Sequence, residues 1–149
     1  MNIRVAIASD HAGFRLKSLV IEHLKSAAYQ VDDVGPASPE RCDYPDYASA
    51  VSQQVTEGNA DYGVLVCGSG VGMSMAANKI RGIRAALAHN PMTARLSREH
   101  NDANVLCLGS RLIGEAVALE SVDAFLAGRF QGGRHQDRIA KMVALEERR

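Results

Sequence analysis

A cysteine beside a glycine-rich turn is the feature of the sequence that most suggests chemistry. The strand-like run 62–67 ends in Cys67, and Gly68, Gly70 and Gly72 follow it ahead of helix-forming residues. We therefore expect a strand, a glycine turn and a helix start, whose backbone N–H groups converge on negative charge. A thiol at the edge of such a nest could take a proton from carbon while the amides hold the developing anion.

These glycines do not match the common nucleotide-binding loops. The dinucleotide fingerprint needs glycine or alanine where this chain has Met73, and an acidic residue about 20 positions later, where it has Ala88 and His89. The phosphate loop that ends in Gly-Lys-Ser/Thr is absent, and a nucleophile elbow would need glycine in place of Cys67. Two alternatives stay open here: a tight turn that binds nothing, and an inert buried thiol.

Two further pairs of residues could move protons or bind an anion. Asp10 and His11 follow the first predicted strand and could relay protons between substrate oxygens or contact a phosphate. The alternative is an Asp cap on the first helix with an exposed histidine. Arg134 and Arg138 share one face at the start of the last predicted helix. Basic residues there oppose the helix dipole unless an anion is bound, and two solvated arginines are the alternative.

Strand-like and helical segments alternate along the chain and predict one domain over residues 1–149. The predicted strands are 4–8, 30–34, 62–67, 83–88 and 105–108. The predicted helices cover about 16–24, 47–55, 73 to near 82, 90–99, 113–127 and the segment after 134. This order predicts an α/β fold in which helices cover both faces of a five-stranded parallel sheet.

The carboxyl ends of parallel strands are where ligands bind in such folds. The loops at that edge carry Asp10, His11, Tyr44, Cys67, Ser69 and Arg111. His100 is expected after a helix and before the fifth strand, which places it at the opposite edge. If His100 serves the Cys67 site, a second subunit must supply it, and the same argument applies to Arg134 and Arg138. We therefore predict a homodimer with the active site at the subunit interface.

The overall composition excludes several classes of partner. The 149 residues include 17 basic and 17 acidic ones, 5% aromatics and no tryptophan, which gives no basis for binding nucleic acid or a membrane surface. No apolar run reaches membrane-spanning length, and the first residues enter a strand pattern without a signal-like segment. Three cysteines without metal-site spacing predict a reduced, cytoplasmic protein.

Several short motifs occur in a fixed order along almost the whole chain. They are SDHAGF at 9–14, DYP at 43–45, CGSGVG at 67–72, AANK at 76–79, GIRA at 82–85, SREHNDANV at 97–105, GSR at 109–111 and GGRH at 132–135, with Arg138 beyond. In these motifs the chain resembles the B-type ribose-5-phosphate isomerase family, which also includes galactose-6-phosphate isomerase subunits.

The resemblance implies an aldose–ketose isomerisation through a cis-enediolate that uses neither metal nor cofactor. One branch of the family has cysteine at the position of Cys67, and the other has glycine there with glutamate at the position of Met73, so this chain resembles the cysteine branch. Cys67 would move the proton between C1 and C2, and His100 would open the furanose ring. The enediolate oxygen would be stabilised by the amides of Gly68, Ser69, Gly70, Val71 and Gly72.

The remaining site residues implied by the resemblance contact the sugar or its phosphate. Asp10 and Ser69 would act beside Cys67, although close relatives of the cysteine type often carry threonine at the position of Ser69. The other expected contacts are His11, Tyr44, Asn101, Arg111, Arg134 and Arg138. The resemblance also implies the family's fold, a Rossmann-like three-layer α/β/α sandwich, which agrees with the predicted order of elements. The family usually forms dimers, which sometimes pair into tetramers.

Three other functions compete with ribose-5-phosphate isomerisation. The phosphosugar could be allose 6-phosphate or galactose 6-phosphate, since the sequence does not give the distance between thiol and phosphate site. Galactose-type enzymes work as unlike subunits, whereas this chain carries Cys67, His100 and both late arginines itself, which favours a homodimer. The protein could also bind sugar phosphates without turnover, or act as a dinucleotide-binding module.

Overall fold

The computed structural model describes residues 2–148, in which strands and helices alternate as predicted. The strands are β1 (Arg4–Ser9), β2 (Gln30–Gly35), β3 (Tyr62–Cys67), β4 (Ala85–Leu87) and β5 (Val105–Gly109). The helices are α1 (Phe14–Ser26), α2 (Tyr44–Thr56), α3 (Val71–Ala77), α4 (Pro91–Asn101), α5 (Glu115–Ala127) and α6 (Arg134–Ala144), followed by a short 3-10 turn, η1 (Leu145–Arg148).

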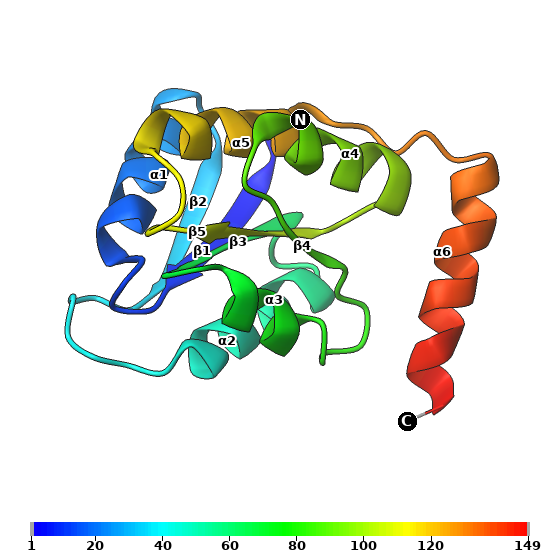
Figure 1. The fold of residues 1–149 in the computed structure, drawn as a ribbon, viewed down its shortest axis with the longest axis horizontal. Coiled ribbons are helices and arrows are strands. Elements are labelled where there is room, and N and C mark those ends of the chain that lie inside the picture. The colour runs from blue at the N-terminus through cyan, green and yellow to red at the C-terminus, as the bar shows by residue number, and fades with distance from the viewer. Residues whose placement is uncertain (1, 149) are drawn as a thin grey trace.

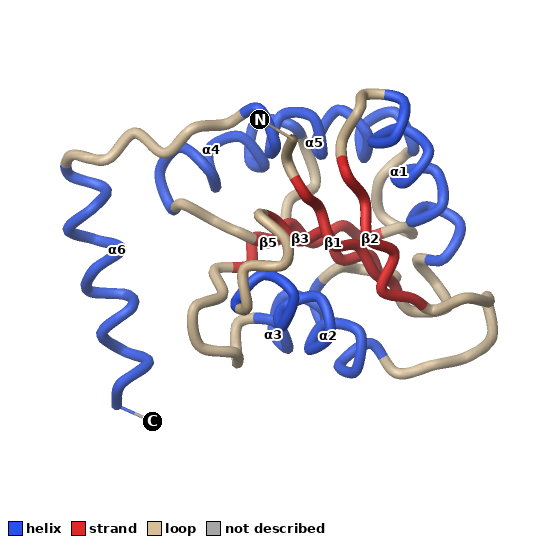
Figure 2. Tube along the Cα trace, turned by 180° about the vertical axis from the view of Figure 1, so that it is seen from behind, coloured by secondary structure: helices blue, strands red, loops and turns tan. Residues whose placement is uncertain are grey.

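The five strands form one parallel sheet in the order β2-β1-β3-β5-β4. Helices α1, α4 and α5 cover one face and α2 and α3 cover the other, as Figures 1 and 2 show from opposite sides. The predicted three-layer α/β/α sandwich is therefore confirmed. Because β5 is inserted between β3 and β4, strand β3 lies between β1 and β5. Strand β3 ends in the glycine turn, so the ends of β1 and β5 can reach that turn.

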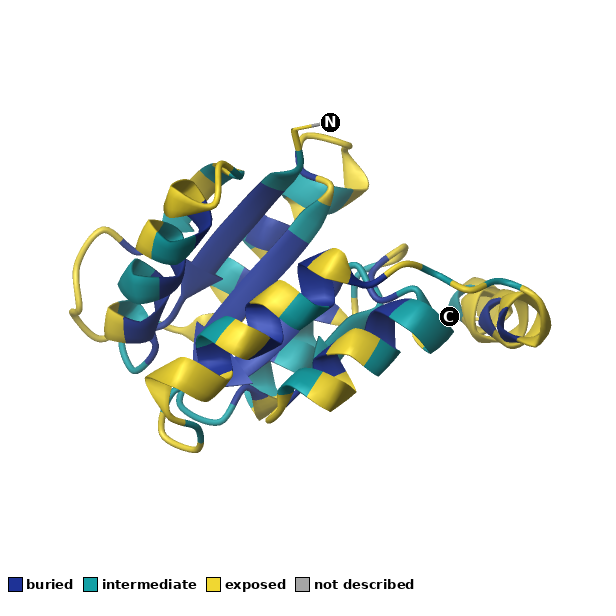
Figure 3. Cartoon of the chain, turned by 90° about the horizontal axis from the view of Figure 1, so that it is seen from above, coloured by how far each residue is buried: buried dark blue, intermediate teal, exposed yellow. Residues whose placement is uncertain are grey.

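Both faces of the sheet are buried, so its central strands are almost entirely apolar (Figure 3). Along β3, Val64 and Val66 pack toward α1, α4 and α5, whereas Leu65 and Cys67 pack toward α2 and α3. Successive side chains of a strand point to opposite faces, and this alternation directs the Cys67 thiol to the α2/α3 side.

Helix α6 stands apart from the sandwich (Figures 1 and 3). His135 and Ile139 are its only buried side chains, while Met142, Val143 and the following Leu145 are exposed. At its far end, the Glu146 carboxylate accepts the backbone N–H of Gly82 at 3.2 Å. The helix therefore presents an apolar side that the chain itself covers only in part. No helix within residues 2–148 has the length and apolar character needed to span a membrane.

Two predicted boundaries around β4 are wrong. Helix α3 ends at Ala77 rather than near Gly82, because the Asn78 side chain turns back onto Ala85. Asn78 Oδ1 accepts the Ala85 N–H at 2.8 Å, and Asn78 Nδ2 donates to the Ala85 carbonyl at 2.9 Å. Strand β4 is also shorter than the predicted 83–88, since the Arg84 N–H donates to the side chain of Asn104 instead of to a strand.

Candidate active site

The Cys67 thiol lies at the carboxyl end of β3, where it is 4% exposed, and faces the glycine turn. Its Sγ accepts the backbone N–H of Gly70 at 3.1 Å. Gly70 has φ +76°, and a Cβ there would lie 2.5 Å from Leu87 Cδ1 and 3.0 Å from the backbone carbon of Leu108. Only glycine fits this position, and the resulting turn aims an amide at the sulfur. Such a contact stabilises negative charge on the sulfur.

The rest of the turn is shaped by a serine and a tyrosine. Ser69 Oγ accepts the N–H of Val71 at 3.2 Å. The ring of Tyr44, at the start of α2, lies against Gly72, where an added Cβ would be 2.6 Å from Tyr44 Cζ. The amides of Gly70 and Val71 therefore bind the thiol and the serine hydroxyl within the turn.

Asp10 and His11 follow β1 on the same edge of the sheet. The Asp10 N–H donates to the Val66 carbonyl at 3.1 Å, which holds this loop beside the end of β3. Asp10 is buried, and its Oδ1 accepts the Gly13 N–H at 3.0 Å. Since α1 begins at Phe14, this hydrogen bond resembles the predicted alternative, in which Asp10 caps the first helix. His11 is partly buried rather than exposed. Its Nδ1 lies 3.3 Å from the backbone nitrogen and 3.2 Å from the carbonyl oxygen of Cys42.

The loop after β5 adds a guanidinium group to this edge. The Ser110 N–H donates to the Cys67 carbonyl at 2.8 Å, and the Arg111 N–H donates to the Gly68 carbonyl at 3.0 Å. A Cβ on Gly68 would lie 3.3 Å from Arg111 Nη1, so the exposed guanidinium borders the turn. This group of residues is called the thiol half-site below; it consists of Asp10, His11, Tyr44, the turn from Cys67 to Gly72, and Arg111.

His100 and Asn101 lie elsewhere, in the last turn of α4. Helix α4 extends to Asn101, beyond the predicted end near Glu99. The helix stops after Asn101 because Asp102 adopts a left-handed conformation at φ +46° and its carboxylate binds two arginines. Arg98 Nη1 donates to Asp102 Oδ1 at 2.7 Å, and Arg84 Nη2 donates to Oδ2 at 3.2 Å. His100 and Asn101 are thereby held on a rigid helix end.

The His100 ring stacks on that of His135, with centroids 4.3 Å apart and planes 9° apart. His135 lies in the first turn of α6, between the exposed Arg134 and Arg138. Burial, followed by the charges of His100, Arg134 and Arg138, lowers the pKa of His135 below its ordinary value. This second group, called the imidazole half-site below, consists of His100, Asn101, Arg134, His135 and Arg138. His135 belongs to the GGRH motif, but the sequence assigns it no role because that role depends on where α6 packs.

One chain does not bring the two half-sites together. Cys67 pairs with Gly109 at the carboxyl end of β5, whereas α4 ends just before Val105 at the amino end. Four residue steps of about 3.3 Å place these two edges of the sheet about 13 Å apart. The thiol and the His100 imidazole of the same chain therefore lie on opposite edges.

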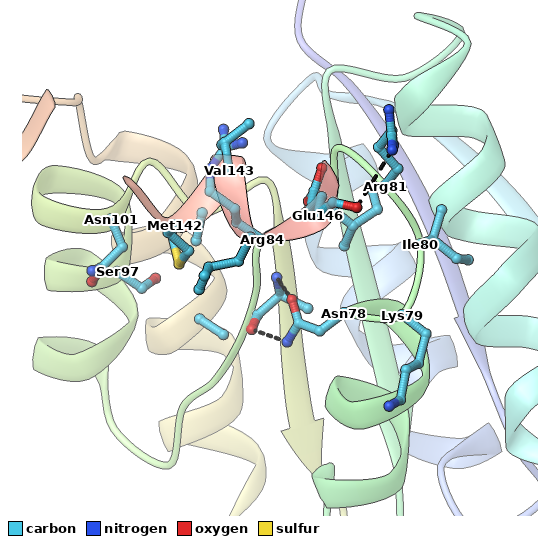
Figure 4. A pocket seen from close by; sticks show the side chains of 15 residues that line it. Asn78, Lys79, Ile80, Arg81, Arg84, Ser97, Asn101, Met142, Val143 and Glu146 are labelled. Atoms are coloured by element: carbon cyan, nitrogen blue, oxygen red, sulfur yellow. Dashed lines mark hydrogen bonds between the residues drawn. The ribbon is translucent and has the colours of Figure 1, made fainter. Parts of the chain in front are cut away.

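A cavity of about 640 Å³ opens beside the imidazole half-site, between α6 with η1 and the segment 78–86 (Figure 4). Asn101, Met142 and Leu145 line it, and no residue of the Cys67 turn does. Much of the lining is apolar. At one end of the cavity, Arg81 Nη2 donates to the Glu146 carbonyl oxygen at 3.4 Å. The cavity therefore belongs to the region where α6 leaves the sandwich, not to the thiol half-site.

The other two cysteines differ from Cys67 in their surroundings. Cys107 is fully buried on β5, and burial, followed by the charge of the nearby Cys67, raises the pKa of its thiol far above the ordinary value. Cys42 meets His11 through its backbone atoms. Within residues 2–148, no group of three or more His, Cys, Asp or Glu side chains is arranged to hold a metal ion.

Comparisons with known proteins agree with the fold and the motifs. A family model described as Ribose/Galactose Isomerase matches residues 5–142. The chain is 49% identical over 146 residues to ribose-5-phosphate isomerase B of Escherichia coli strain K12, covering 98% of each protein. The structure is similar to that of ribose-5-phosphate isomerase B from Clostridium thermocellum, with a TM-score of 0.97, 46% identity and coverage of 98% of this chain and 99% of the other.

A second solved structure contains a bound sugar phosphate. It is ribose-5-phosphate isomerase B from Mycoplasma genitalium with bound ribulose-5-phosphate. The two structures match with a TM-score of 0.94 and 45% identity, over 100% of this chain and 99% of the other.

Proposed function

The chain belongs to the ribose/galactose isomerase family, and on that premise we propose that it interconverts D-ribose 5-phosphate and D-ribulose 5-phosphate without a metal ion. The observation that carries this proposal is the Cys67 thiol at the edge of the glycine turn, with the Gly70 N–H 3.1 Å from its sulfur. The relatives named ribose-5-phosphate isomerase B, and the one with bound ribulose-5-phosphate, support the substrate.

Ribose 5-phosphate must first open from its furanose ring. In the proposed mechanism the His100 imidazolium donates a proton to the ring oxygen O4 as the C1–O4 bond breaks. The Asp10 carboxylate takes the proton from the C1 hydroxyl, and C1 becomes the aldehyde carbon. Asp10 suits this role because it is buried, and because only one of its oxygens is engaged by the Gly13 N–H.

The Cys67 thiolate then takes the proton from C2, and the released electron pair forms the C1–C2 double bond of a cis-enediolate. The negative charge moves to O1, where the turn amides and the Ser69 hydroxyl stabilise it. A proton passes from O2 to O1 by way of Asp10, C2 becomes the ketone carbon, and the Cys67 thiol returns its proton to C1. In the open-chain sugar, the net change moves one hydrogen from C2 to C1 and one from O2 to O1. The proton that remains on Asp10 is lost to solvent, and His100 takes up a proton from solvent before the next turnover.

The phosphate would lie among the basic side chains of both half-sites. Arg111 and His11 border the thiol half-site, and Arg134 and Arg138 project from the first turn of α6. Arginine binds phosphate oxygens through paired N–H groups, and an anion at this helix start also offsets the dipole. Asn101 and Tyr44 would contact the sugar from opposite sides.

The chemistry also supports a homodimer. O4, C1 and C2 belong to one small ring, and a proton donor or acceptor must approach each to about 3 Å. Cys67 and His100 of one chain lie at opposite edges of the sheet, which are about 13 Å apart, so they cannot both act on the same sugar. A second copy can supply the imidazole half-site to the thiol half-site of the first. The exposed Met142 and Leu145 beside the cavity are apolar surface that such a partner would cover.

Turnover of ribose 5-phosphate, measured with and without EDTA, tests the proposed function. We expect wild-type activity that resists the chelator, and a loss of at least about 1,000-fold in Cys67→Ala, because the thiol is the base assigned to the C2 proton. Cys42→Ala is the matched control and keeps its activity, since Cys42 contacts His11 through backbone atoms. An active Cys67→Ala variant would exclude the thiol as base. A wild-type protein without turnover would redirect the assay to allose 6-phosphate and galactose 6-phosphate.

Mixing two inactive variants tests the shared site. In equal mixtures of refolded Cys67→Ala and His100→Ala chains, half of the dimers are mixed, and each of these contains one intact site. About a quarter of wild-type activity should therefore return. Mixtures that remain inactive, while each variant still forms dimers, would contradict the assignment of the two half-sites to different chains.

A further inference from the structure

The His100–His135 stack is the feature of the imidazole half-site that the proposed reaction does not yet use. His100 comes from the last turn of α4 and His135 from the first turn of α6, and their rings are nearly parallel at 4.3 Å. Within residues 2–148, no protein group forms a hydrogen bond with a ring nitrogen of either histidine, whereas His11 and His23 both have such partners. The stack is therefore the contact that sets the orientation of the His100 ring.

The two rings differ in their surroundings. His135 is 8% exposed, and it has the cationic Arg134 and Arg138 on its own helix. Burial, followed by the charges of His100, Arg134 and Arg138, lowers the pKa of His135. His100 is only partly buried. The stack therefore places a partly accessible ring, which can meet a substrate, on a buried ring that cannot.

We propose that His135 is a positioning residue for ring opening: its buried ring stacks on that of His100 and fixes the plane of the His100 ring. This role rests on the proposed isomerase function. Stacked aromatic rings attract each other, so the contact restrains the orientation from which His100 gives its proton to O4. His135 itself touches no reacting atom, and the O4 proton comes from His100.

Comparing two reactions of the same enzyme separates this role from a general structural one. The first is conversion of ribose 5-phosphate, which begins with ring opening. The second is exchange of a C1 hydrogen of ribulose 5-phosphate with solvent deuterium, followed by NMR. Ribulose 5-phosphate cannot form a furanose because its 5-hydroxyl carries the phosphate. The exchange thus needs Cys67 and the phosphate contacts but no ring-opening acid.

We expect His135→Ala to lower kcat/KM for ribose 5-phosphate by about 10-fold or more, and the C1 exchange rate by less than about threefold. His135→Phe retains a stacking ring without a titratable group and should recover conversion to within about threefold of wild type. His23→Ala, which removes an imidazole bound to Asp123 far from both half-sites, should change neither reaction.

Several results would overturn the positioning role. Equal losses in conversion and exchange would make His135 a structural support for the whole half-site, and so would a Phe variant as impaired as the Ala variant. Unchanged conversion in His135→Ala would show that the stack is dispensable. If the wild-type protein performed neither reaction, the proposed isomerase function would fail first, which is a different outcome from any of these.

Discussion

Two properties of the turn require glycine at position 70, and replacing Gly70 with alanine tests both. The first is the left-handed conformation at φ +76°, which costs a residue with a Cβ about 1–2 kcal/mol. The second is space: the new Cβ would lie 2.5 Å from Leu87 Cδ1 and 3.1 Å from the Leu108 carbonyl oxygen. The leucine side chain can rotate, but the β5 backbone cannot, and overpacking of this kind costs about 1–3 kcal/mol. We therefore expect Gly70→Ala to lower the free energy of unfolding by about 2–5 kcal/mol in all.

Gly58 provides a matched control for this substitution. It has the same φ of +76°, and a Cβ there would meet nothing within 4 Å. Gly58→Ala should therefore show only the cost of backbone strain, about 1–2 kcal/mol. Urea unfolding of both variants at the same pH measures the difference, which we expect to be about 1–3 kcal/mol. Equal losses in the two variants would refute the assignment of crowding at Gly70.

The same pair of variants tests the amide that faces the thiol. A hydrogen bond to a charged group contributes about 1.5–3 kcal/mol, so displacing the Gly70 N–H from Cys67 Sγ should lower kcat by about 10- to 100-fold. Gly58→Ala should retain the wild-type kcat. A folded Gly70→Ala protein with unchanged kcat would show that this amide does not assist proton transfer.

Two further predictions concern charged groups outside the half-sites. Lys17 is 1% exposed, and its Nζ donates to Asp33 Oδ1 at 2.8 Å and to the Pro36 carbonyl at 2.7 Å. Lys17→Met should therefore lower the free energy of unfolding, measured in urea, by about 2–4 kcal/mol. Lys25→Met, on the exposed face of the same helix, should lower it far less. The hydrogen bond from Arg4 lowers the pKa of the Asp61 carboxyl. A lowered pKa contributes stability above the unfolded carboxyl value of about 3.9 and loses it as the pH falls through the folded value. Asp61→Asn should thus be less stable than wild type at pH 7 and equally stable once the pH falls below the folded-state pKa. A difference in stability that persists in acid would contradict the linkage.

The sheet and the thiol half-site could be predicted because their signals are local. Apolar runs mark the buried strands, and glycines mark the turn, so the residues that follow β1, β3 and β5 had to meet at one edge. The position of β5 between β3 and β4 has no such signal. Strand β4 contains only Ala85–Leu87, and its place in the sheet depends on how α3 and α4 pack.

The contacts missed from the sequence all join segments far apart in the chain. Lys17 reads as a solvated helix residue, yet it is buried because Asp33 and Pro36 lie where its amine can reach them. The end of α4 depends on Asp102 binding two arginines, one of them 18 residues away. The His100–His135 stack likewise requires a helix that begins 33 residues after α4 ends, and no local pattern predicts such a pairing.

The placement of Cys67 and His100 on opposite edges of one sheet has a genetic consequence for the proposed dimer. A chain that lacks only Cys67 still supplies His100 to the site that contains Cys67 of a wild-type partner. A mixed dimer therefore keeps one working site, and such a mutation is largely recessive. A chain that lacks both residues disables both sites of any dimer it enters. With equal amounts of the two chains, both substitutions in one gene copy leave about a quarter of the sites intact, and so do the same substitutions in separate copies, whereas a site built within one chain would leave about half and none.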